Sequence, residues 1–182
     1  MKNKPIFIEK INELKTKIEL EGYEINGTKE LIGEILVIDT TPLDLLKEEN
    51  GIRDYYESVG IKTQVIRSLE HNLYEFIYRG LKQSIEQLFY FDKTQDYTSR
   101  RFVFSTTDCI SHVHILYRHK KAQLNMYIRS TDVVKLLPWD ILFACKLINR
   151  IIGECGFPEV TTKTVTIMIG SAHFYLKPAA LY

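Results

Sequence analysis

The residues best suited to chemistry are a cysteine and an arginine 20 positions apart, Cys109 and Arg129. Cys109 shortly precedes a predicted strand, Val113–Tyr117, and Arg129 ends the next one, Gln123–Arg129, after a turn at Lys120–Lys121. Strands joined by such a turn pair antiparallel, which brings the start of one beside the end of the other. A neighbouring guanidinium favours the nucleophilic thiolate form of cysteine. The spacing therefore predicts a nucleophilic Cys109 beside Arg129; the alternative is a cysteine that packs as a small apolar residue.

Two more arginines, Arg100 and Arg101, stand at the start of another predicted strand, Arg101–Ser105. The planar fork of a guanidinium matches a phosphate better than the ammonium of lysine does. The pair is thus either a phosphate-binding group or an ordinary charged edge in water. The formal net charge of +1 provides no long-range field for nucleic acid or an anionic membrane, so we expect neither as a partner.

Asp140, His173 and Tyr175 are the remaining polar candidates. Asp140 follows Pro138 at the start of a predicted helix, where proline suits the first turn and the helix dipole stabilises an aspartate. It is either a capping residue or a carboxylate held rigidly for a ligand. His173 and Tyr175 are two positions apart, so in an extended chain their side chains share one side and could meet a sugar hydroxyl. A surface pair is the alternative.

The composition is that of an ordinary globular protein. Of 182 residues, 45% are hydrophobic and 26% charged, which suits one domain over residues 1–182 with its own core. No apolar run has the length of a membrane span, and the first ten residues lack the apolar region of a secretory signal. Cys109, Cys145 and Cys155 form an odd set without CxxC spacing, so we expect no disulfide framework, no metal site and a reducing, cytoplasmic setting.

Apolar periodicity predicts the elements that must position these residues: helices packed on a mixed β-sheet, an α/β protein of the α+β type. Helical spacing covers Pro5–Leu20, a piece that begins at Leu43 and breaks at Asn50–Gly51, most of Ile52–Gln87 with interruptions near Gly60 and Gly80, and Trp139–Gly153. Besides the strands given above, β-rich runs cover Leu31–Thr40 and Thr161–Ile169, and Gly170–Tyr182 is expected to be a loop and tail.

Short motifs in a fixed order resemble the thymidylate synthase family. They are Ser99–Arg100–Arg101, Cys109, Arg129–Ser130 with Asp132, Leu137–Pro138–Trp139–Asp140, and Gly170 followed by His173 and Tyr175. The resemblance covers residues 97–182, the half that would form the nucleotide site, whereas residues 1–96 faintly resemble the short archaeal and phage-like synthases. It implies a thymidylate synthase-like fold and a homodimer that acts on a pyrimidine nucleoside monophosphate with 5,10-methylenetetrahydrofolate.

The resemblance implies catalytic roles for Cys109, Asp132 and Asp140. Cys109 stands where the family's nucleophile adds to C6 of the pyrimidine, and Asp132 stands between base and folate. Asp140 is a departure, because synthases that act on uracil carry asparagine there, whereas dCMP hydroxymethylases resemble this chain in carrying aspartate. A carboxyl group can accept a hydrogen bond from the N4 amino group of cytosine and share a proton with N3, so we expect cytosine. Glu75 is a candidate for the family's catalytic glutamate.

The resemblance assigns other residues to the substrate: Arg129 and Ser130 to the phosphate, Arg100 and Arg101 to the phosphate of the partner chain, and His173 and Tyr175 to the sugar hydroxyl. On the folate side, isoleucine or leucine replaces family residues at 110, 128 and 136, and no long C-terminal cover is expected after Tyr182. Two alternatives to a hydroxymethylase therefore stay open. One is a trimmed nucleotide-binding protein without folate chemistry, and the other is thymidylate synthase activity on dUMP.

Overall fold

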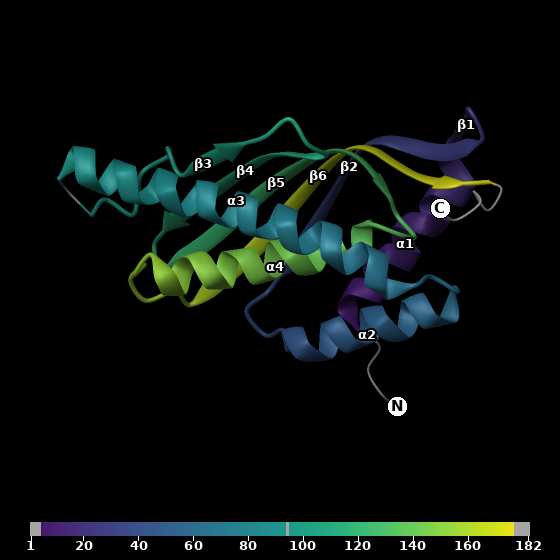
Figure 1. Ribbon diagram of the computed structural model, residues 1–182, viewed down its shortest axis with the longest axis horizontal. Helices are drawn as coiled ribbons and strands as arrows, with labels where there is room; N and C mark the ends of the chain where they lie inside the picture. Colours follow the sequence, from purple (N-terminus) through teal and green to yellow (C-terminus); the bar gives the residue numbers. More distant parts are fainter. Residues whose placement is uncertain (1–4, 94, 177–182) are drawn as a thin grey trace.

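A computed structural model describes residues 5–93 and 95–176, without the side chains of residues 63–72, 91 and 92. Its centre is a six-stranded sheet with the strand order β1-β2-β6-β5-β4-β3 (Figure 1). The strands are β1 (Tyr23–Ile25), β2 (Thr28–Asp39), β3 (Val103–Ser105), β4 (Ile110–Arg118), β5 (Lys121–Asp132) and β6 (Thr162–Tyr175). The helices are α1 (Ile6–Glu21), α2 (Leu45–Ser58), α3 (Thr63–Asp92) and α4 (Leu137–Glu154). β5 and β6 are parallel and joined through α4, whereas the other neighbouring strands are antiparallel, so the predicted mixed sheet of an α+β protein is confirmed.

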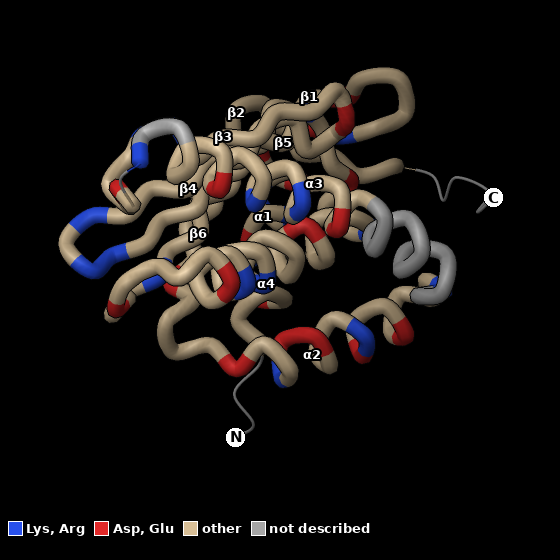
Figure 2. The backbone as a smooth tube through the Cα atoms, turned by 60° about the vertical axis from the view of Figure 1, so that its left-hand side comes forward, with Lys and Arg blue, Asp and Glu red and all other residues tan. Residues whose placement is uncertain are grey.

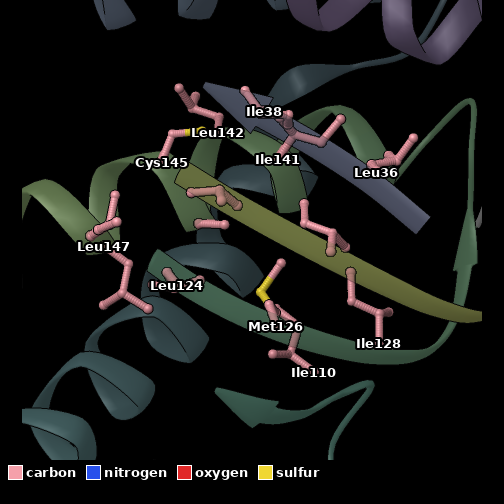
Figure 3. Close-up of a cluster of buried hydrophobic side chains, with 14 of the residues drawn as sticks. Leu36, Ile38, Ile110, Leu124, Met126, Ile128, Ile141, Leu142, Cys145 and Leu147 are labelled. Atoms are coloured by element: carbon pink, nitrogen blue, oxygen red, sulfur yellow. The ribbon is translucent and has the colours of Figure 1, made fainter. Parts of the chain in front are cut away.

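The helices lie on one face of the sheet, and the core fills the space between the two layers (Figure 1). Buried side chains of the sheet form rows across the strands, of which two are Ile38, Val165, Leu124 and Ile115, and Leu36, Ile167, Met126 and Val113. These rows meet the apolar face of α4, where Ile141, Leu142 and Cys145 are buried (Figure 3). Each fully buried aliphatic side chain contributes about 1.5–3 kcal/mol relative to an exposed one, so the core holds α4 firmly at the end of β5.

The opposite face of the sheet is uncovered in the described part of the chain. Ile35 and Val37 of β2 are 61% and 57% exposed there. Ile35 lies beside Met168 of β6, and Met168 lies beside the exposed Tyr127 of β5. Adjacent exposed apolar side chains of this kind mark a surface that contacts another surface.

Two helix breaks predicted at glycines are wrong. α2 runs through Asn50–Gly51, and α3 runs through Gly80. A Cβ atom would lie 2.2 Å from the Pro5 ring at Gly51 and 2.0 Å from the Phe104 ring at Gly80, so both glycines make room for a neighbouring side chain. The predicted interruption at Gly60 is confirmed, and φ there is +74°.

The segment Gly170–Tyr175, predicted to be a loop, is the second half of β6. It pairs with the start of β2 on one side and with Ser130–Asp132 of β5 on the other. These two neighbours give its backbone groups the partners that a strand needs, in spite of its glycine and polar residues. His173 and Tyr175 are therefore fixed at the end of the sheet. Residues 177–182, the rest of the predicted loop and tail, lie outside the described residues.

The pairing is interrupted at one level across β2, β6 and β5. Between β2 and β6, Gly33 and Gly170 stand opposite each other but are left out of the strand pairing. Between β6 and β5, the same is true of Gly170 and Arg129. Residues of a regular strand alternate between the two faces, yet Ile169 and Ala172, three positions apart, are both buried. A Cβ atom at Gly170 would lie 2.6 Å from the Arg129 carbonyl oxygen. Like a β-bulge, this irregularity re-aims the side chains beyond it, and the candidate residues 130–132 and 173–175 lie there.

Charged residues of both signs are interspersed on the helices, as along α2 in Figure 2. This distribution agrees with the near-zero net charge and leaves the recognition of a charged ligand to local groups. Among the described helices, none combines the length and the apolar character needed to cross a membrane.

Candidate functional site

Cys109 lies in the loop before β4 and is exposed. Arg129 of β5 fixes this loop, because its backbone N–H donates to the Cys109 carbonyl oxygen at 2.9 Å. The guanidinium adds two bonds, from Nε to the Asp108 carbonyl oxygen (3.2 Å) and from Nη2 to the Thr107 carbonyl oxygen (3.1 Å). The β4–β5 hairpin thus brings Cys109 and Arg129 side by side, as the sequence predicts. The guanidinium holds the backbone that carries the thiol.

A hollow of about 420 Å³ opens beside the thiol. It is lined by Leu73 and Phe76 of α3 and by Asp108 and Cys109. Phe76 packs edge-on against Phe104, with 5.4 Å between the ring centroids, which fixes this wall. Apolar walls with a few polar groups are typical of sites that bind small flat molecules.

Ser130, the next residue of β5, reaches the end of β6. Its Oγ lies 3.3 Å from Nδ1 of His173. The His173 and Tyr175 rings stand edge to face with centroids 5.7 Å apart, and the Lys135 ammonium lies 5.1 Å from the centre of the Tyr175 ring. The structure therefore brings Ser130, His173 and Tyr175 together at one end of the sheet.

Asp132 is 4% exposed and shapes the turn between β5 and α4. Its Oδ1 accepts hydrogen bonds from the backbone N–H groups of Val134 (2.9 Å) and Lys135 (3.0 Å). Its Oδ2 lies 3.9 Å from the Lys135 ammonium. One carboxylate oxygen thus organises the backbone, and the other has a long ion pair.

Asp140 lies in the first turn of α4, two residues after Pro138, as predicted. Thr131 of β5 donates from Oγ1 to Oδ2 of Asp140 at 2.9 Å. Burial raises the pKa of Asp140 to about 7, and the Thr131 hydrogen bond partly opposes this rise. The residue keeps some exposed surface, but its carboxyl group lies among protein atoms. Near neutral pH this carboxyl group is therefore able both to donate and to accept a hydrogen bond.

Arg100 and Arg101 are exposed in the segment before β3. The Arg100 carbonyl oxygen lies 3.1 Å from Nε2 of His114, which is four residues along β4 from Ile110. At about 3.3 Å per residue, this places the pair roughly 13 Å along the strand from the Cys109 loop. Within one chain, the structure does not join Arg100 and Arg101 to the other candidates.

Sequence reasoning missed several polar residues at this end of the sheet. Thr131 stands between two predicted site residues in the Arg-Ser-Thr-Asp motif, and this position could have identified it as a site residue. Ser171 donates to Glu30 Oε2 at 2.5 Å beside Ser130, and an extended β6 would have revealed this pair. Lys135 gives no signal in the sequence, because the turn at Asp132 determines its position.

Other reactive groups are engaged elsewhere. Glu75 of α3 binds the Arg150 guanidinium of α4 at 2.7 Å. Burial raises the pKa of the Cys145 thiol to about 12 and that of the Cys155 thiol to about 11. Within residues 5–93 and 95–176, no group of three or more histidine, cysteine, aspartate or glutamate residues is arranged to hold a metal ion.

Comparison with known proteins gives one class of fold. No protein-family model matches the sequence, and no curated protein matches it. Among solved structures, the chain is similar to thermostable thymidylate synthase A from Bacillus subtilis, with a TM-score of 0.55 and 13% sequence identity. The similarity covers 93% of this chain and 79% of the synthase. The chain therefore has a thymidylate synthase-like fold, in agreement with the order of its motifs.

Proposed function

We propose that this chain transfers a one-carbon unit to C5 of a pyrimidine nucleoside 5′-monophosphate, most like a dCMP hydroxymethylase. The observation that carries the proposal is the end of β5. Arg129 bonds the Cys109 loop, and Ser130 bonds His173. Thr131 bonds Asp140, and Asp132 bonds the turn before α4. One rigid strand thus supports a nucleophile, a carboxyl group that could read a base and a histidine that could meet a sugar. The thymidylate synthase-like fold supports the same class of reaction.

In the proposed mechanism, the Cys109 thiolate adds through Sγ to C6 of the base. The electron pair of the C5–C6 double bond moves to C5, which becomes nucleophilic. Arg129 positions the thiol and places positive charge near it. Asp140 shares its proton with N3 and so stabilises the negative charge that develops on the ring. With the one-carbon unit on C5, loss of the C5 proton would release the folate carrier and leave an exocyclic methylene group. Addition of water to this group would supply the hydroxyl of a hydroxymethyl product, and departure of the thiolate from C6 would restore the aromatic ring.

We propose that the protein binds both the phosphate and the sugar of the nucleotide. Arg129 and Ser130 bind the phosphate within one chain, while His173 and Tyr175 bind the sugar hydroxyl. Arg100 and Arg101 lie away from this group, and we propose that they serve the phosphate of a partner chain in a homodimer. Remote binding energy of this kind positions the ring for attack.

The donor in this proposal is 5,10-methylenetetrahydrofolate, which supplies the one-carbon unit when bound. A hollow of about 290 Å³ lies between α1 and the turn at Asp132, with Phe174, Tyr175, Lys15 and Lys135 among its lining residues. The Phe174 ring suits the flat ring system of a folate, and Lys135 suits its glutamate carboxylates. Glu19 also lines the hollow and lies 3.8 Å from the Lys15 ammonium, so Lys15 is already paired. The residues present therefore fit this cofactor, and Asp132 would lie between it and the base.

Tritium release tests the proposal. The protein is incubated under reducing conditions, which suit the cytoplasmic setting we propose, with dCMP or dUMP labelled at C5, with and without methylenetetrahydrofolate. We expect folate-dependent release from dCMP. Cys109→Ala should abolish release and spare nucleotide affinity, whereas the matched control Cys155→Ala should retain release because that thiol is half-buried and outside the site. Turnover by Cys109→Ala would show that another group is the nucleophile.

Two other outcomes would change the proposal. Nucleotide binding without any tritium release would favour a trimmed nucleotide-binding protein. That alternative is supported by the apolar residues Ile110, Ile128 and Leu136 at positions that the family uses on the folate side. Release from dUMP alone would favour thymidylate synthase activity and would contradict the base-reading role of Asp140.

A further inference from the structure

We infer that Asp108 is the catalytic residue that removes the C5 proton once the pyrimidine carries the one-carbon unit. The inference rests on the proposed function, in which Cys109 adds to C6 and the C5 proton must then leave. The roles given above to Asp132 and Asp140 do not include an acceptor for this proton.

Asp108 and Cys109 are neighbours in the chain and line the same hollow of about 420 Å³. Consecutive Cα atoms lie about 3.8 Å apart, so neighbouring residues that line one hollow can contact the same small molecule. The other described lining residues, Leu73 and Phe76 of α3, are apolar. Among the described residues around this hollow, Asp108 is therefore the one titratable group besides the thiol.

The carboxylate is the part of Asp108 that remains available to a ligand. The Asp108 backbone N–H donates to Oγ1 of Thr106 at 2.8 Å, and its carbonyl oxygen accepts from Nε of Arg129 at 3.2 Å. Both backbone polar groups thus hold the loop in place. Within residues 5–93 and 95–176, no hydrogen bond or ion pair engages the carboxylate, and the residue is exposed. The carboxylate is therefore the polar group that Asp108 can present to the hollow.

The bond to Cys109 determines where C5 of the pyrimidine lies. Once Sγ has bonded to C6, C5 is two bonds from the sulfur, whichever way the ring turns about the C6–S bond. C5 therefore stays beside the hollow that Asp108 lines, irrespective of which edge of the pyrimidine faces Asp140. A carboxylate oxygen within roughly 3 Å of the reacting group, or linked to it by one water molecule, can accept a proton.

The proton transfer leaves every electron pair accounted for. The C5–H bond breaks, and its proton passes to the Asp108 carboxylate. The electron pair of that bond forms the double bond from C5 to the one-carbon unit. The bond between this unit and its folate carrier breaks, and the carrier keeps that electron pair and takes up a proton. The proton on Asp108 is then released to water, which restores the carboxylate.

Substitution of Asp108 tests the inference through folate-dependent tritium release from C5-labelled dCMP. Asp108→Asn removes the base and keeps the shape, and release should fall at least about 100-fold, as expected for loss of a general base. Asp108→Glu keeps a carboxylate and should lose less. The matched control, Asp54→Asn, makes the same change at an exposed position of α2 and should release tritium at the wild-type rate.

Two further measurements distinguish a base from a residue that only shapes the loop. Mass spectrometry of Asp108→Asn should show the nucleotide still attached to Cys109, because attachment precedes the proton transfer. In Asp108→Ala, which also serves if the asparagine protein does not fold, added formate should restore part of the release by occupying the vacated space. Chloride at the same ionic strength should not.

The outcomes separate the inference from the proposed function. Wild-type release in Asp108→Asn, loss of the attachment to Cys109 in that variant, or equal rescue by chloride and formate overturns the inference and leaves the proposed function intact. Absence of release from both nucleotides with the wild-type protein contradicts the proposed function and the inference with it.

Discussion

Single residues in this fold differ in chemistry because their surroundings differ. Cys109 is exposed, whereas burial raises the pKa values of Cys145 and Cys155 to about 12 and about 11. A thiol with a pKa three units above the solution pH is about one part in a thousand thiolate, and thiolate is the reactive form. Reactivity toward a disulfide reagent should therefore separate the three residues.

At pH 8, an Ellman-type reagent should detect one fast thiol in the native chain. The other two should react at least about 100-fold more slowly and appear fully only after denaturation. Cys109→Ser should remove the fast phase, while Cys155→Ser should leave it in place. Two fast thiols in the native protein would contradict the burial of Cys155.

Asp140 should make stability depend on pH. Its folded pKa of about 7 lies above the ordinary value of 3.8, so the folded protein binds more protons than the unfolded chain between about pH 4 and pH 7. Stability should therefore fall as the pH rises through this window. Asp140→Asn has no carboxyl group at this position and should not lose stability in this way. The free energy of unfolding of Asp140→Asn, relative to wild type, should therefore rise from pH 4 to pH 8. The rise should be smaller than about 4 kcal/mol, because the residue keeps some exposed surface. Urea denaturation of both proteins at the two pH values measures this, and a constant difference would contradict the pKa.

At the scale of elements, two helical glycines have opposite surroundings. A Cβ atom at Gly80 of α3 would meet the Phe104 ring at 2.0 Å, whereas one at Gly153 of α4 would meet nothing within 4 Å. Gly80→Ala should therefore destabilise the protein by about 1–3 kcal/mol through overpacking. Gly153→Ala should stabilise it by about 0.5–1 kcal/mol, because alanine is the better helix former.

Thermal and denaturant unfolding of both glycine variants measures these effects. Equal and small changes at the two positions would show that α3 shifts away from β3 at little cost. A loss of stability in Gly153→Ala would contradict the open space that surrounds this position at the end of α4.

The elements also show what the sequence could predict. Apolar periodicity located the four helices of the described residues, and the alternating runs around Lys120–Lys121 located the hairpin that joins Cys109 to Arg129. Prediction from the sequence failed at Gly51, Gly80 and Gly170–Tyr175, where contacts with residues far away in the chain determine the local structure. A glycine that admits a distant ring has the same local sequence as one that ends a helix, and a polar strand between two partners has the same local sequence as a loop.

The candidate site shows the same division. The spacing of Cys109 and Arg129 predicts that they meet, because a hairpin is a local structure. The bonds from Arg129 to the Thr107 and Asp108 carbonyls, and from Thr131 to Asp140, depend on the interrupted pairing level and on where α4 begins. Neither is encoded in a short motif.

At the scale of the whole molecule, the uncovered face of the sheet is the surface through which we propose that two copies pair. Val37, 57% exposed on this face, is the position at which to test this. Val37→Arg places a charge among apolar neighbours and should convert a dimer to a monomer at micromolar concentration. Leu20→Arg is the matched control, because Leu20 is 78% exposed on α1, on the helical side. Light scattering coupled to size-exclusion chromatography gives the mass of each protein, and a monomeric wild-type protein would contradict the pairing.

The position of β6 has a consequence for how the chain folds during synthesis. β6 lies between β2 and β5, so it joins a piece made early, α1 to β2, to a piece made late, β3 to β5. Until Tyr175 has left the ribosome, the exposed edges of β2 and β5 have no partner, and the nascent chain holds two incomplete sheets. Pairing across more than 120 residues is slow, because a long loop must close before its contacts are gained. The edge of β2 therefore has no partner from the synthesis of Asp39 until β6 emerges, and the edge of β5 has none from the synthesis of Asp132 until then. A chaperone that shields strand edges would act in these intervals.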